Sequence, residues 1–424
     1  MWKRICAVLI LFTWTSAAAQ LNRPLQDSSI QTIEYALQRA YAAQQIQADT
    51  FALQTRAQKD DKSWQLALFL AARNRSISET LDEIKGQMNW GPVKLAAVLD
   101  LTPTGNTSTT KCTCEKGNCK KPLAAPSQIT LYVLYRTGII TRQDTYTLDL
   151  SDNPARLWGE LLKYLKAGQS AYQTGVIIDA HASGYNFFYG KEESFSSQQL
   201  VQSLTASRLH VDVLELHSCH MSSLKNVYQW TKNAQIDYVV ASSDISLSSN
   251  TTMYYRVLRF LQNSPRQAAI SSVRDRMKIF DFKDVYNTNN AVALQLSILR
   301  RPIQNYATQY KELLSYEGTE EMEKIFEGYF TEEFYDWHSL RNIVEKQKKY
   351  VQTHLEPQAD AFYETQQQFV AASDKLLNAL PSATLAQWCY SKKDHKVYQG
   401  QAPASSGCLE SVSTTQAQFW SFYE

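Results

Sequence analysis

A histidine and a cysteine stand at the ends of two short apolar segments of this chain. Residues 175–180 lead into His181, and residues 211–218 lead into Cys219. Apolar runs of this length are typical of buried parallel strands. An open α/β sheet gathers its catalytic groups at the carboxyl ends of neighbouring parallel strands. The pattern therefore predicts a thiol and its base facing each other at one edge of a sheet.

The segment between the two runs has the pattern of a connecting helix. Residues 197–208 place Leu200, Val201 and Leu204 on one helical face. Parallel neighbours in a sheet require such a crossover. We therefore expect the order strand, histidine, helix, strand, cysteine.

Hydrolysis of an amide bond is the chemistry that suits this pair. A free thiol has a pKa of about 8.5, so Cys219 needs a nearby imidazole, and the positive end of the following helix, to become a thiolate. His181 can protonate the leaving amine. The backbone N–H of Cys219 and that of Ala182 or Ser183 are candidates for an oxyanion hole.

Two further histidines flank the cysteine. We interpret His217 and His220 as pocket-lining or surface groups. Together with His181 and Cys219 they also offer nitrogen and sulfur ligands for zinc or copper, so an exported metal-binding protein is an alternative. Alternation along a strand turns His220 away from His217 and Cys219, which disfavours that alternative.

The first residues have the form of a secretory signal peptide. Residues 1–19 contain Lys3 and Arg4, then an apolar run, then three alanines before Gln20. We expect an exported protein, periplasmic or secreted, whose mature chain begins at Gln20. No later stretch reaches the roughly 18 apolar residues of a membrane span. The formal charge of +2 disappears with Lys3 and Arg4, so the overall charge does not favour nucleic acid or a membrane surface as a partner.

The cysteines of the mature chain favour disulfides, because export places them in an oxidising compartment. Cys389 and Cys408 are candidates for closing one short loop, and Cys119 is a partner for Cys112 or Cys114. A metal held by the three clustered thiols is the alternative, but that cluster lacks a fourth ligand nearby.

Strands and helices alternate along the first part of the chain, which predicts an α/β fold with a doubly wound, mainly parallel sheet flanked by helices. Helices are expected at 76–88 and 154–167, and a long polar loop at 102–127. Strands are expected, besides the two named above, at 63–71, 93–100, 129–135, 145–150 and 236–241.

The chain divides into four predicted regions. They are the signal peptide 1–19, a helical lead-in or propeptide 20–62, the α/β core 63–264 and a mostly helical C-terminal region 265–424. The last region is assigned from amphipathic patterns at 319–326, 336–350 and 358–380.

The order of short motifs between residues 63 and 255 resembles the clostripain-like cysteine peptidases of the caspase-like clan. The motifs are Asp179-Ala180-His181-Ala182-Ser183-Gly184, Ser218-Cys219-His220-Met221 and Tyr238-Val239-Val240-Ala241-Ser242-Ser243-Asp244. The resemblance implies a caspase-like sheet, with Cys219 as nucleophile and His181 as its partner. It also implies polypeptide substrates and no required cofactor, with Ca²⁺ allowed by the resemblance alone.

The chain departs from the family pattern in the glycine-poor stretch 246–252 and at two site positions. The family usually has glycine where this chain has Ala182, and relatives that cleave after Arg or Lys have an acid where this chain has His217. We assign His217 and Asp244 to the substrate pocket, and Lys191, within the polar stretch 189–194, as a processing site. Because of the two departures, a catalytically inactive binding module with a peptidase fold remains the alternative to an active endopeptidase.

Overall fold

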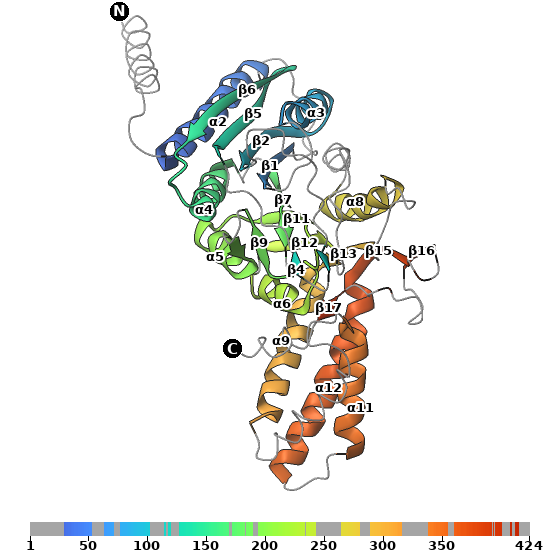
Figure 1. Cartoon of the computed structure of the whole chain (residues 1–424). Coiled ribbons are helices and arrows are strands. Elements are labelled where there is room, and N and C mark those ends of the chain that lie inside the picture. The colour runs from blue at the N-terminus through green and yellow to red at the C-terminus, as the bar shows by residue number, and fades with distance from the viewer. Residues whose placement is uncertain are drawn as a thin grey trace, which may run out of the picture.

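A ten-stranded sheet runs through the protein and carries helices on both faces (Figure 1). The computed structural model describes residues 29–52, 63–71, 77–101, 114–115, 118–119, 127–168, 172–182, 184–189, 194–233, 235–242, 264–279, 289–315, 338–354, 360–391, 393, 395–400, 408 and 412–414.

The strands of the sheet lie in the order β16-β15-β13-β12-β11-β7-β1-β2-β5-β6. Their bounds are β1 Ser63–Leu70, β2 Val93–Asp100, β5 Ile129–Thr137, β6 Ile140–Leu148, β7 Tyr172–Asp179, β11 Val211–His217, β12 Ile236–Ala241, β13 Asn289–Gln295, β15 Thr384–Ser391 and β16 Lys396–Gln399.

Only the centre of the sheet is parallel. Strands β2, β1, β7, β11 and β12 pair in parallel, whereas β5 and β6 on one side and β13, β15 and β16 on the other are antiparallel. The α/β fold is as predicted, but the prediction of a mainly parallel sheet ending at residue 241 was too narrow. Strand β13 runs directly into one helix and β15 directly follows another, so no turn residues mark their limits in the sequence.

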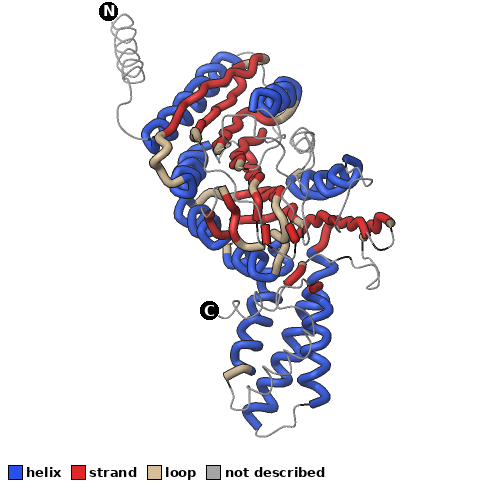
Figure 2. The backbone as a smooth tube through the Cα atoms, viewed as in Figure 1, coloured by secondary structure: helices blue, strands red, loops and turns tan. Residues whose placement is uncertain are grey.

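Helices cover the two faces unequally (Figure 2). One face packs against α2, α4, α5, α6 and α9, and the other packs against α3 and α8, which gives two separate clusters of buried apolar side chains. The bounds are α2 Ser29–Ala52, α3 Ile77–Trp90, α4 Pro154–Leu165, α5 Ser197–Ser207, α6 Leu224–Lys232, α8 Pro265–Ile279 and α9 Leu296–Leu313.

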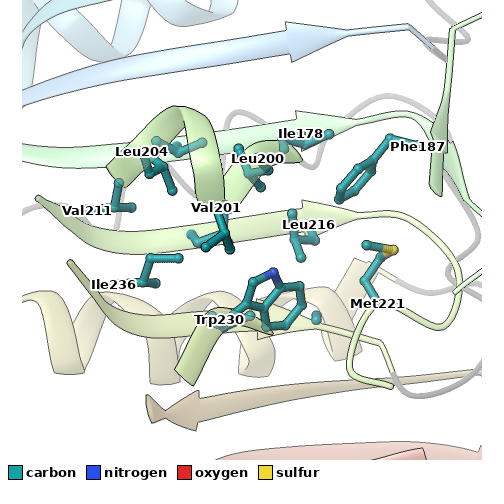
Figure 3. Close-up of a cluster of buried hydrophobic side chains, with 14 of the residues drawn as sticks. Ile178, Phe187, Leu200, Val201, Leu204, Val211, Leu216, Met221, Trp230 and Ile236 are labelled. Atoms are coloured by element: carbon teal, nitrogen blue, oxygen red, sulfur yellow. The ribbon is translucent and has the colours of Figure 1, made fainter. Parts of the chain in front are cut away.

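Alternation along the strands produces these two clusters, because successive side chains point to opposite faces. In β1, Ala67 and Phe69 belong to the larger cluster, whereas Leu66, Leu68 and Leu70 belong to the smaller. Figure 3 shows part of the larger cluster, where side chains of α5 and Trp230 of α6 cover β7 and β11.

The C-terminal helices extend away from the sheet as a bundle (Figure 1). Helix α9 packs against α12 (Asp360–Ala383), where the Tyr306 and Tyr310 rings lie 5.6 and 5.8 Å from the Phe369 ring. Helix α11 (Leu340–His354) completes the group. Residues 265–424 therefore contribute these helices and also three strands of the central sheet.

The remaining strands are short. A three-stranded sheet has the order β10-β9-β8, and two-stranded sheets pair β14 with β17 and β3 with β4. Their bounds are β3 Cys114–Glu115, β4 Asn118–Cys119, β8 His181–Ala182, β9 Asn186–Phe188, β10 Ser194–Ser196, β14 His338–Ser339 and β17 Ser413–Thr414.

A disulfide links β15 to the segment that follows β16. Cys389 and Cys408 are bonded, as the sequence predicted. Cys112 and the side chains of Cys114 and Cys119 lie outside the described residues, so their pairing stays a prediction. Across the described segments, no helix combines the length and apolarity needed to cross a membrane.

Candidate active site

The two strands that lead to His181 and Cys219 are direct neighbours in the sheet. Strands β7 and β11 pair in parallel, with Asp179 opposite His217. His181 comes two residues after Asp179, and Cys219 comes two residues after His217. Both segments therefore leave the sheet at the carboxyl ends of neighbouring parallel strands, as the sequence predicted.

Buried hydrogen bonds join the two segments beyond the sheet. The hydroxyl of Ser218 donates to the carbonyl of Ala180 at 2.7 Å. The Ser223 hydroxyl and the Asn226 amide both donate to the carbonyl of Gly184, each at 2.7 Å. Because these donors are buried, the bonds hold the histidine segment against the cysteine segment.

Cys219 lies in a tight turn between β11 and α6. The residue is 7% exposed, and its thiol forms no disulfide. The next residue, His220, has φ of +54°, a left-handed conformation that is uncommon outside glycine. Helix α6 begins at Leu224, so residues 220–223 separate Cys219 from the helix that was predicted to follow it. The partial positive charge at the start of a helix stabilises a nearby anion only within about one helical turn.

A second buried polar group lies beneath this edge. The Nε2 atom of His217 is 3.1 Å from Oε1 of Glu215, and both side chains are almost fully buried. The Ser272 hydroxyl of α8 donates to the same oxygen at 2.8 Å. Glu215 was not among the predicted site residues, although an acid within the mostly apolar residues 213–216 was the available signal.

The other predicted site residues are placed only in part. Ala182 is buried in β8, opposite Phe187 of β9. The side chain of His181, and the whole of Ser183, Asp244 and Lys191, lie outside the described residues. Their roles stay predictions.

One metal-compatible group occurs among the described residues, at the opposite end of β11. It consists of His210, Asp212 and Asp237. The hydrogen bond to Asp237 raises the pKa of His210 above its ordinary value, in opposition to burial. Ca²⁺ prefers about six to eight oxygen ligands. An imidazole with two carboxylates does not match that preference, and Ca²⁺ binding stays a prediction of the family resemblance.

Comparison with known proteins extends the resemblance seen in the sequence. The model of the clostripain family matches residues 168–370, a range that includes both His181 and Cys219. Over these residues the chain is similar to the clostripain family. No curated protein matches the chain significantly.

Two solved structures of C11 proteases are similar to this chain, and the first shares its fold. An inactive zymogen C11 protease from Parabacteroides distasonis has a TM-score of 0.53 and 11% identity, with 86% of this chain and 96% of that chain covered. A secreted C11 cysteine protease from Bacteroides thetaiotaomicron, in complex with an irreversible peptide inhibitor, has a TM-score of 0.49 and 16% identity. That match covers 83% of this chain and 92% of the other.

Proposed function

We propose that this protein is an exported cysteine endopeptidase that hydrolyses peptide bonds through Cys219 and His181. The parallel register of β7 and β11 is the observation that supports it most, because both residues leave the sheet at the same level. The bond from Ser218 to Ala180 holds the two segments together. A nucleophile and its base must be held together in this way.

The proposed reaction proceeds through an acyl-enzyme. The Cys219 thiolate attacks the carbonyl carbon, and the backbone N–H groups of Cys219 and Ala182 stabilise the oxyanion that forms. The C–N bond then breaks as the His181 imidazolium gives its proton to the leaving amine. Water, deprotonated by His181, hydrolyses the thioester and restores the thiol. The steps require no organic cofactor.

The proposed substrate pocket contains His217 and Asp244. Within the clostripain family, an acid at the position of His217 suits a basic substrate side chain. Here Oε1 of Glu215 lies 3.1 Å from Nε2 of His217, so an acidic residue is next to the histidine. We also propose Lys191 as a processing site. Export is supported by the predicted signal peptide and by the Cys389–Cys408 disulfide.

The direct test is cleavage of a mixture of peptides that presents every residue type before the scissile bond. The protein is incubated under mildly reducing conditions and the products are read by mass spectrometry. We expect cleavage by the wild type and none by Cys219→Ala or His181→Ala. His395→Ala is the matched control, because His395 lies in the exposed turn before β16.

The alternative is a binding module that keeps the fold without catalysis. Absence of cleavage by the wild type, together with failure of Cys219 to react with thiol-directed peptide probes, would replace the peptidase proposal with that function. Cleavage that persists in Cys219→Ala would instead assign the reaction to another group.

A further inference from the structure

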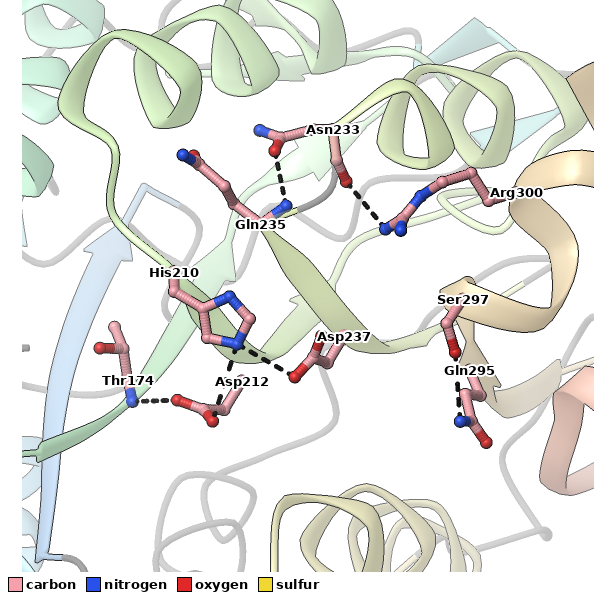
Figure 4. Close-up of polar contacts among 9 residues, drawn as sticks. All are labelled: Thr174, His210, Asp212, Asn233, Gln235, Asp237, Gln295, Ser297 and Arg300. Atoms are coloured by element: carbon pink, nitrogen blue, oxygen red, sulfur yellow. Dashed lines mark hydrogen bonds and ion pairs between the residues drawn. The ribbon is translucent and has the colours of Figure 1, made fainter.

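The amino ends of β11 and β12 bring together three side chains that the proposed peptidase reaction does not use (Figure 4). His210 directly precedes β11, and Asp212 and Asp237 are the second residues of β11 and β12. The first residues of these strands pair with each other, so Asp212 and Asp237 lie next to each other across the sheet. The group forms only when the sheet forms.

The distances suit one small cation. The His210 Nε2 atom lies 3.0 Å from Oδ2 of Asp237 and 4.0 Å from Oδ1 of Asp212. All three ligand atoms lie within 4.8 Å of one another. Zinc binds nitrogen and oxygen at about 2.0–2.2 Å, which in a tetrahedron separates its ligands by about 3.5 Å. Small side-chain movements would let the three atoms share one ion.

A contact from a third strand fixes one of the carboxylates. The backbone N–H of Thr174 in β7 donates to Oδ2 of Asp212 at 2.7 Å. The other oxygen, Oδ1, is the one nearer to the His210 ring. Carboxylate ligands of metals are commonly oriented by such a second hydrogen bond.

Charge and access favour a cation from solvent. The side chains of His210, Asp212 and Asp237 are 36%, 18% and 43% exposed. Two cationic side chains lie near the group. The charge of Lys166 lowers the pKa of His210, and the charge of Arg266 lowers the pKa of the neighbouring Tyr238. With a neutral imidazole, the two carboxylates still make the group itself anionic.

We propose that His210, Asp212 and Asp237 bind a zinc-class divalent cation, with water completing its coordination. An imidazole nitrogen among the ligands selects zinc over the oxygen-preferring Ca²⁺ and Mg²⁺. The whole length of β11 separates the group from Cys219, a distance on the order of 20 Å. The ion therefore joins two strands and takes no part in peptide hydrolysis.

Zinc binding is best measured in a Cys219→Ala background, because the Cys219 thiol is a competing zinc ligand. The full-length protein is stripped with EDTA and titrated calorimetrically with Zn²⁺ alone. We expect one ion per chain, and a loss of affinity of about tenfold or more in His210→Gln and in Asp237→Asn. His395→Gln is the matched control and should bind like the parent.

Thermal unfolding gives a second readout that does not depend on activity. Zinc at about 100 µM should raise the melting temperature of the parent and of His395→Gln, but not that of His210→Gln or Asp237→Asn. Equal melting temperatures without zinc would show that the variants fold. Unchanged affinity in both ligand variants, no binding at that concentration, or calcium binding at least as tight as zinc would overturn the proposal.

Discussion

Single hydrogen bonds determine how the two segments of the candidate active site lie against each other. The Ser218 hydroxyl is buried, and its acceptor, the Ala180 carbonyl, belongs to the segment that carries His181. A buried acceptor that loses its donor destabilises the protein by about 1–3 kcal/mol. Ser218 is therefore a positioning residue in our proposal, because it acts through the segment that carries His181.

Replacement of Ser218 by alanine should lower both stability and turnover. We expect Ser218→Ala to lose about 1–3 kcal/mol of unfolding free energy and to reduce kcat more than it raises KM. The checks are urea denaturation and steady-state kinetics on a peptide cleaved by the wild type. Ser315→Ala is the control, because its hydroxyl bonds to the Glu312 carbonyl in an exposed position. An unchanged kcat would show that the bond supports the fold alone.

Capping residues determine where helices α4 and α5 begin. At the start of α4, Oδ1 of Asn153 accepts the backbone N–H groups of Ala155 and Arg156 at 2.9 and 3.2 Å, and Pro154 occupies the first turn. At the start of α5, Ser196 and Gln199 form a reciprocal capping box. Both arrangements satisfy N–H groups that a helix leaves unpaired, so short-range residues decide where these helices begin.

The contribution of the Asn153 side chain at the start of α4 can be measured by mutation. We expect Asn153→Ala to lower the unfolding free energy by about 1 kcal/mol, because its side chain no longer accepts the two N–H groups. Urea denaturation with a fixed slope would measure the change. Asn153→Asp retains an acceptor and should remain close to the wild type. Equal losses in the two variants would show that Asn153 contributes through other contacts.

Across the whole molecule, the C-terminal half completes the sheet and also packs against the candidate peptidase core. Arg300 of α9 donates from Nε to the Thr231 carbonyl at 3.2 Å and from Nη2 to the Asn233 carbonyl at 3.4 Å. Gln304 donates to the same Thr231 carbonyl at 3.0 Å. These bonds satisfy carbonyls at the C-terminal end of α6, the helix that follows the Cys219 turn. The two halves therefore depend on each other for stability.

The Cys389–Cys408 disulfide should contribute to the unfolding free energy of the whole protein. Cys389 and Cys408 are separated by 19 positions. A loop of this size is stabilised by about 3 kcal/mol in the chain-entropy account. We expect the double variant Cys389→Ala/Cys408→Ala to unfold at a lower guanidinium midpoint than the wild type.

Reduction supplies the control for that prediction. Dithiothreitol should lower the midpoint of the wild type more than that of the double variant, which lacks the Cys389–Cys408 bond. Cys219→Ala should keep the full response, because Cys219 is outside the disulfide. A double variant as stable as the wild type would show that the loop contributes nothing measurable.

Much of the α/β core was predictable from the sequence alone. The strands that precede His181 and Cys219, and the helix between them, were recognised because apolar runs and helical periodicity are local patterns. The Cys389–Cys408 pairing was also anticipated from a short spacing. Such features need no knowledge of what a segment will pack against.

Tertiary structure alone decided which distant residues meet. Glu215 and Ser272 are separated by 57 positions, and their contact exists only because α8 covers that face of β11. His210, Asp212 and Asp237 meet because β11 and β12 pair in one register. Strands β13 and β15 join the sheet by antiparallel pairing between remote segments. Burial and backbone hydrogen bonding over the whole sheet select such partners, whereas local residue patterns specify only the elements themselves.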